Sequence, residues 1–229
     1  MTLRRNILAL DATTDLCSVA WTDGSRWVES TELAGQRHSA LLLGMVDTVL
    51  REAGRALRDM DEIAFGAGPG SFTGLRIACG IAQGLALGAQ LPVRAVSSLM
   101  ALAQATDGRA VIAALDARMN EVYWAAYRRG TQDNRWHAVS GPAVARPAAV
   151  FAPDGGDWVG AGSGFAAYPA LCVQLCAQGR VDATVAVTAH AIAGLALAGQ
   201  GILGPADAAS PHYVRDKVAQ TTAERAATH

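Results

Sequence analysis

Residues 63–90 read IAFGAGPGSFTGLRIACGIAQGLALGAQ: a short apolar run, a glycine-dense loop and then a long apolar segment. The last segment has the length of a helix, but it is interrupted by Gly74, Gly80, Gly84 and Gly88. Each glycine inside a helix costs about 0.5–1 kcal/mol relative to alanine. The glycines must therefore serve something other than the stability of this helix.

The loop before the helix does not match the usual phosphate-binding motifs. A Walker A loop ends in Gly-Lys-Ser/Thr, but no lysine follows Gly70. A dinucleotide-binding fingerprint that begins at Gly66 needs glycine at position 71, where this chain has Ser71. Ser71 is instead a good N-cap for the helix. The stretch predicts a buried strand, a tight turn and a capped helix that ends near Ala89.

Two rows of small residues run along this helix. Gly80, Gly84 and Gly88 are four residues apart on one side. Ala78, Ala82 and Ala86 form a row nearly opposite. Leucine and isoleucine fill most of the remaining surface, whereas an ordinary surface helix has a wide polar face. The helix is thus covered on more than one side, either by a partner that approaches the glycine row or by the core of its own chain.

The composition limits what kind of protein this is. The chain has 229 residues, of which 51% are hydrophobic, and its formal net charge is -1. A large core is therefore possible, and a main role in gripping nucleic-acid backbone is disfavoured. The N-terminal apolar stretch ends too early for a signal peptide, and Arg76 and Gln83 argue against a membrane span at 75–91. The four cysteines form no Cys-x-x-Cys pair, which indicates buried thiols in a cytoplasmic protein.

Two stretches of the chain resemble each other. ILALDATTDLCSVAWTDG (7–24) and IAALDARMNEVYWAAYRRG (112–130) each contain a strand that ends in Leu-Asp-Ala, a polar turn and a second strand. A duplicated unit explains this better than chance. Paired hairpins of this kind are typical of the two-lobed fold of actin, sugar kinases and heat-shock chaperones, where they hold nucleotide phosphate and its metal. The candidates for a vestigial nucleotide cleft of this kind are Asp11, Thr13, Thr14 and Asp116. The alternative is that the turns need these residues only to satisfy their own backbone groups.

The segments around these hairpins predict an α/β fold: two duplicated lobes, each a mixed sheet flanked by helices. A helix that ends near Gly54 carries an apolar stripe. The stripe consists of Leu42, Met45, Val46, Val49 and Ala53. The predicted domains are an N-terminal lobe (1–104), a C-terminal lobe (105–208) and a final segment (209–229) that returns to the first lobe. Because no low-complexity linker is present, we expect the lobes to pack closely.

Four motifs resemble the bacterial TsaB family, also called YeaZ. They are LALDATTDLCSVAW, GAGPGSFTGLRIACGIAQGLALG, AALDARMNEVYWAAY and the late PHYVR. The resemblance implies the actin-like fold and a place in the pathway that puts threonylcarbamoyl on the adenosine beside the anticodon of tRNA. It implies a non-catalytic subunit that acts with its catalytic paralogue TsaD and the ATPase TsaE, meets tRNA indirectly, and forms a homodimer when alone. No cofactor is expected for the chain itself, and ATP or ADP only in the complex.

The same resemblance carries a glycoprotease label, which the sequence does not favour. TsaD-type proteins bind a metal through a His-x-x-x-His pair, at a place where this chain reads VSSLM (96–100). The five histidines are far apart in sequence, so we expect no metal site. They are His38, His137, His190, His212 and His229. A metal-independent peptidase and a sugar-kinase-like ATP-binding enzyme remain as alternatives.

Together these features predict a docking face for the paralogue on the two N-terminal helices. It is expected to include the glycine row and the stripe of the first helix. The predicted residues are Leu42, Met45, Val46, Val49, Leu75, Gly80, Gly84 and Gly88.

Overall fold

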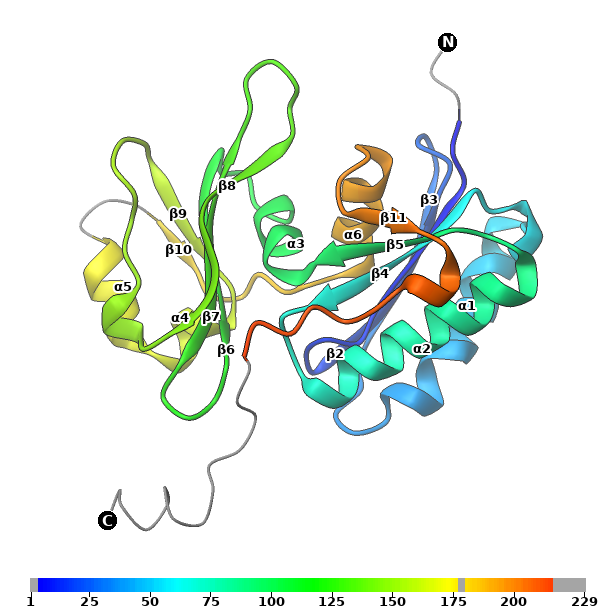
Figure 1. Ribbon diagram of the computed structural model, residues 1–229, viewed down its shortest axis with the longest axis horizontal. Helices are drawn as coiled ribbons and strands as arrows, with labels where there is room; N and C mark the ends of the chain where they lie inside the picture. Colours follow the sequence, from blue (N-terminus) through cyan, green and yellow to red (C-terminus); the bar gives the residue numbers. More distant parts are fainter. Residues whose placement is uncertain (1–3, 177–179, 216–229) are drawn as a thin grey trace.

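The computed structural model describes residues 4–176 and 180–215, and it shows two lobes, each built on a mixed sheet (Figure 1). The first sheet has the strand order β11-β5-β4-β1-β2-β3. Its strands are β1 (Ile7–Asp11), β2 (Leu16–Thr22), β3 (Trp27–Leu33), β4 (Glu62–Gly68), β5 (Val93–Ser97) and β11 (Ile202–Gly204). The antiparallel meander β1-β2-β3 is extended by β4 and β5, which run parallel to β1.

The second sheet repeats this arrangement, with the order β10-β9-β6-β7-β8. Its strands are β6 (Ala110–Asp116), β7 (Val122–Arg129), β8 (Trp136–Ala145), β9 (Trp158–Ala161) and β10 (Val181–Asp182). Here too the first three strands are antiparallel and the last two run parallel to the first. The predicted duplication and the two-lobed α/β fold are thus confirmed, and the repeat extends to all five strands.

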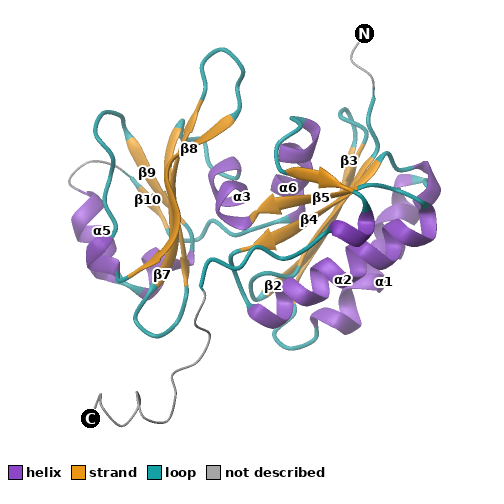
Figure 2. Cartoon of the chain, in the orientation of Figure 1, coloured by secondary structure: helices purple, strands orange, loops and turns teal. Residues whose placement is uncertain are grey.

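Helices cover the outer faces of both sheets and fill the space between them (Figure 2). They are α1 (His38–Ala53), α2 (Phe72–Ala89), α3 (Ser98–Gln104), α4 (Ser163–Ala167), α5 (Pro169–Cys176) and α6 (Ala189–Leu197). The local signals hold: Gly54 ends α1 in the left-handed conformation, and the Ser71 hydroxyl caps α2 by accepting from the Gly74 amide at 3.3 Å.

Successive side chains of a strand point to opposite faces of its sheet, and the buried apolar side chains form three clusters. Leu8 and Leu10 of β1 face α1 and α2, whereas Ile7 and Ala9 face the other side. That other side is a core shared by both sheets together with α3 and α6. The outer face of the second sheet packs on α4 and α5. Because the two sheets share one core, the lobes are closely packed, as expected from the absence of a linker.

The chain returns to the first lobe earlier than the predicted boundary at 209. The helix α6 packs against β1 and β2, and the Ala189 amide donates to the Ser18 hydroxyl at 2.8 Å. The strand β11 then pairs with β5. The assignment of residues 188–208 to the second lobe was therefore wrong. These residues carry apolar side chains that cover the first sheet, which the order of elements along the sequence does not reveal.

The apolar stripe of α1 is not a docking face. Leu42, Met45, Val46 and Val49 are at most 5% exposed and pack on the chain's own first sheet. An apolar stripe on a helix beside a sheet is most simply used to cover that sheet, and here it does so. Leu75 is also buried, at 2% exposed. These five residues of the predicted docking face lie in the interior.

The three strands β3, β8 and β9 were not predicted. The strands β3 and β8 carry mixed polar sequences at the outer edge of each sheet, and β9 lies in a stretch that reads as loop. Within the described residues, α2 is the one helix whose length and mean hydropathy of 1.3 would suit a membrane span. Its alanine row, however, is buried against the first sheet.

Candidate functional site: the inter-lobe cleft and the outer face of α2

A cleft of about 890 Å³ lies between the lobes. The first lobe contributes the turn after β1, with Thr14, and the N-terminus of α2, with Ser71 and Phe72. The second lobe contributes the turn after β6, with Asp116 and Arg118. The cleft thus lies where the two predicted hairpins face each other.

The first hairpin turns its aspartate away from this cleft. Asp11 is fully buried, and its carboxylate accepts from the Thr13 hydroxyl at 2.9 Å and from the Thr13 amide at 3.2 Å. Burial raises the pKa of Asp11 to about 7, and the hydrogen bonds from Thr13 only partly oppose that rise. Thr13 in turn accepts from Ser98 at 3.3 Å. Asp11 and Thr13 therefore form a buried cluster that supports the turn.

Glycines allow the loop before α2 to lie directly on this turn. A Cβ atom at Gly66 would lie 1.9 Å from Oδ1 of Asp11, and one at Gly74 would lie 1.8 Å from the Ala12 carbonyl oxygen. Only glycine fits at these two positions. Gly74 therefore differs in role from the three later glycines of α2.

The second hairpin has a different turn. The Asp116 carboxylate is partly exposed and is held by the Arg118 amide at 2.8 Å, the Arg118 guanidinium at 3.1 Å and the Tyr168 hydroxyl at 3.1 Å. Arg118, Met119 and Asn120 all have positive φ values near 60°. Such a run is uncommon for residues other than glycine. It directs Arg118 and Met119 toward the cleft.

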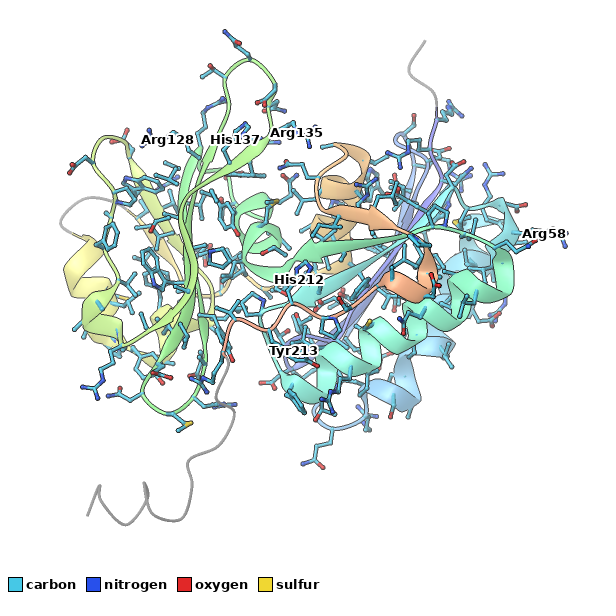
Figure 3. The ribbon with its side chains drawn as sticks, viewed as in Figure 1. Arg58, Arg128, Arg135, His137, His212 and Tyr213 are labelled. Atoms are coloured by element: carbon cyan, nitrogen blue, oxygen red, sulfur yellow. The ribbon has the colours of Figure 1, made fainter. Side chains whose placement is uncertain are left out.

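A C-terminal strap, residues 209–215, runs across the cleft (Figures 1 and 3). On the first lobe, the His212 amide donates to the Ala67 carbonyl at 2.7 Å, and the Ala209 carbonyl accepts from Gln83 of α2 at 2.8 Å. Burial lowers the pKa of the His212 imidazole. The expected return of the segment 209–229 to the first lobe thus holds for residues 209–213, and residues 216–229 lie outside the described part of the chain.

The strap crosses from the first lobe to the second between Tyr213 and Arg215. The Tyr213 ring lies 5.7 Å from that of Phe72, and its hydroxyl accepts from Arg76 at 3.2 Å. Arg215 forms an ion pair with Glu121 and lies 5.7 Å above the Tyr123 ring. The motif PHYVR is part of the family resemblance, but the sequence does not predict that it bridges the two lobes. The alternating aromatic and basic residues of this motif were the available signal.

This arrangement does not fit the nucleotide and metal that the fold implies. Of the four predicted cleft residues, Thr14 and Asp116 line the cleft, whereas Asp11 and Thr13 are buried beneath it. The Asp116 carboxylate is already engaged by Arg118 and Tyr168. In residues 4–176 and 180–215, no three His, Cys, Asp or Glu side chains come together as a metal site. Ser97 and Ser98 lie at the start of α3, where Ser97 caps the helix.

The outer face of α2 is open. Apart from the adjacent residues and the nearby backbone of α2 itself, no atom lies within 4 Å of the Cβ positions at Gly80, Gly84 and Gly88. Leu87 beside them is 61% exposed. Ala78, Ala82 and Ala86 on the opposite side are fully buried. Of the two possibilities for the glycine row, the interior of the chain's own core is therefore excluded. The row is a smooth external strip of helix backbone.

The comparisons with known proteins agree with these features. A model of the family "TsaD: tRNA N6-adenosine threonylcarbamoyltransferase" matches residues 30–222. The protein "tRNA threonylcarbamoyladenosine biosynthesis protein TsaB" of Escherichia coli K12 is 46% identical over 173 residues, which is 72% of this chain and 74% of that protein. The chain belongs to the TsaB family. A TsaB protein of Haemophilus influenzae is 49% identical over 122 residues, 52% of each chain.

Solved structures show the same fold for this TsaB family member. A Pseudomonas aeruginosa protein, described as similar to the peptidase YeaZ, superposes with a TM-score of 0.81 at 39% identity. The match covers 92% of this chain and all of that one. YeaZ of Pseudomonas aeruginosa gives a TM-score of 0.78 at 39% identity, over 91% of this chain and 99% of that one. The two-lobed architecture is thus that of YeaZ.

Proposed function

We propose that this chain is a non-catalytic scaffold and activator subunit for the transfer of threonylcarbamoyl to the adenosine beside the anticodon of tRNA. It would act by forming a heterodimer with the catalytic paralogue TsaD. The pathway is inferred from the names of the relatives, which are tRNA threonylcarbamoyladenosine biosynthesis proteins. The observation that carries the scaffold role is the open glycine row of α2, which lies on a lobe whose hairpin aspartate is buried.

The outer face of α2 has the properties of a helix-docking surface. Because Gly80, Gly84 and Gly88 lack side chains, a second helix can approach the α2 backbone closely and gain dispersion contacts along its length. Leu87 on α2 is 61% exposed, and Leu43 on the neighbouring α1 is 52% exposed. Both leucines add apolar area. A standard interface buries about 800 Å² per partner. When TsaD is absent, the same face would pair with a second copy of this chain.

The alternative enzymatic readings need groups that the described residues do not bring together. A metal-independent peptidase needs a serine or cysteine nucleophile beside a general base. In this part of the chain, His38 bonds the Thr14 carbonyl, His137 bonds Asp133 and His190 bonds Glu29, so none of these three histidines bonds a serine or cysteine. A sugar-kinase-like enzyme needs both hairpin carboxylates in the cleft, but Asp11 is not there. We therefore assign no catalytic residue to this chain, and nucleotide and the ATPase TsaE would act only in the complex. We also propose that this chain acts in the cytoplasm.

Reconstitution of the modification tests this proposal. TsaD, TsaE, tRNA, ATP and a preformed, activated threonylcarbamoyl donor would be combined with and without this chain, and threonylcarbamoyladenosine would be measured. Modification should require the chain, and the Asp116→Asn variant should support it within about twofold of the wild type. If Asp116→Asn abolishes modification while it still binds TsaD normally, the chain takes part in the chemistry and the scaffold role is wrong.

A further inference from the structure

Four arginines lie at one end of the second lobe, away from the cleft. Arg109 precedes β6, Arg128 and Arg129 end β7, and Arg135 precedes β8. Figure 3 shows Arg128, His137 and Arg135 close together at this end, and the sheet register places Arg128 opposite His137. We call Arg109, Arg128, Arg129 and Arg135 the arginine rim.

The arginine rim is not neutralised by acidic partners. In the part of the chain that the structure describes, six other arginines form ion pairs with carboxylates, but none of these four does. The nearby acids are Asp107, Asp133, Asp154 and Asp157, and of these Asp133 pairs with His137. The other three are exposed and make no ion pair with the rim.

The sheet brings two of these charges directly together. The Arg129 amide donates to the Arg109 carbonyl at 2.7 Å, so the two residues face each other across β6 and β7. Like charges at directly opposite positions destabilise a sheet. Neither of these two arginines forms an ion pair with a carboxylate of the described residues. An unpaired local conflict of this kind is expected where an external anion supplies the opposite charge.

The guanidinium groups are also held in place without losing their charge. Arg109 donates to the Gly130 carbonyl at 3.1 Å, and Arg135 donates to the Gly199 carbonyl at 3.1 Å. Arg128 and Arg129 lie over the rings of Trp158 and Trp136, at 5.2 Å and 5.4 Å. A carbonyl engages only one or two of the five N–H donors of a guanidinium. Most of these donors remain available to phosphate oxygens, which arginine binds in a bidentate manner.

We propose that the arginine rim binds the phosphate backbone of RNA, and that it gives this chain a direct contact with the tRNA whose modification it supports. This inference rests on the proposed function, which supplies the RNA. The contact is independent of base sequence, because contacts to phosphate oxygens carry no direct sequence information. It goes beyond an indirect relation to tRNA through the paralogue.

Two matched charge-removal variants test the contact. Arg109→Gln/Arg135→Gln removes two rim charges that do not lie over tryptophan rings. Arg37→Gln/Arg58→Gln removes two exposed charges from the first lobe, and Arg58 lies at the far edge of that lobe (Figure 3). Binding of an unmodified tRNA transcript to the full chain, alone and with TsaD, would be followed by fluorescence anisotropy from 50 to 300 mM salt.

The rim variant should bind tRNA about tenfold more weakly at low salt, with the slope of log affinity against log salt reduced by about 1–2. The first-lobe variant should bind like the wild type. Equal loss in both variants, or no loss in either, would overturn the proposal, as would competition by polyglutamate as strong as that by tRNA. If the rim variant binds tRNA normally while reconstitution still requires the chain, the RNA contact is wrong and the scaffold function stands.

Discussion

Both sides of α2 carry a row of small residues, but one row is buried and the other faces open space. Ala78, Ala82 and Ala86 are fully buried against the first sheet, whereas around Gly80 and Gly84 there is open space. On the inner side small residues let the helix lie close to its own sheet. On the outer side these glycines contact no other part of the described chain, and we propose that contact with another molecule offsets their cost to the helix.

The first helical glycine belongs to the inner side, and replacing it should have the largest effect. A Cβ at Gly74 would lie 1.8 Å from the Ala12 carbonyl oxygen, which is backbone and cannot yield easily. We expect Gly74→Ala to lower the free energy of unfolding by more than about 3 kcal/mol. Gly80→Ala should raise it by about 0.5–1 kcal/mol. Urea unfolding of both variants would measure this, and equal effects would remove the distinction between the two sides.

The hairpin beneath the N-terminus of α2 predicts a dependence on pH. Because the pKa of Asp11 is raised to about 7, the folded chain keeps its proton between pH 4 and pH 7 while the unfolded chain loses it. Stability should therefore fall as pH rises through this window, on the order of 3 kcal/mol, and level off above it.

The Asp11→Asn variant checks that assignment. Asparagine has the same shape and no charge, so its stability should vary less between pH 5 and pH 8 and should exceed that of the wild type at pH 8. Thermal melts across this range would show the two curves converging at acidic pH. An unchanged slope in Asp11→Asn would mean that another group titrates.

The middle of the inner row predicts a smaller loss. Ala82 is fully buried, and Ala82→Leu forces α2 away from the first sheet. Overpacking of this kind costs about 1–3 kcal/mol. The midpoint of urea unfolding should fall in this variant, whereas Gly84→Leu on the outer side should leave the midpoint unchanged or higher. A similar fall in both would show that the outer side also packs within the chain.

Local sequence signals predict the elements around the site. Ser71 at the start of α2 and Gly54 at the end of α1 act through the backbone of their own helix, so their roles can be read without the fold. The duplicated Leu-Asp-Ala turns likewise indicated two lobes. These features depend on residues that are neighbours along the chain.

The features that were missed depend on distant residues. A stripe such as Leu42–Val49 has the same pattern whether it covers a sheet or a partner, and only the position of β2 beside α1 decides. The burial of Asp11 depends on the loop at Gly66–Gly74, and the path of the strap depends on contacts such as Gln83 with Ala209. Contacts between residues so far apart along the chain cannot be read from the sequence alone.

The central claim is that the outer face of α2 docks another molecule, and Gly84→Leu tests it most directly. The affinity for TsaD would be measured by calorimetry for the wild type, for Gly84→Leu and for Ala138→Leu, which adds the same side chain at an exposed position of β8. We expect Gly84→Leu to melt no lower than the wild type as a monomer and to bind TsaD at least about 100-fold more weakly, since bulk there separates two helices. Ala138→Leu should bind normally. Normal binding of TsaD by Gly84→Leu would contradict the claim.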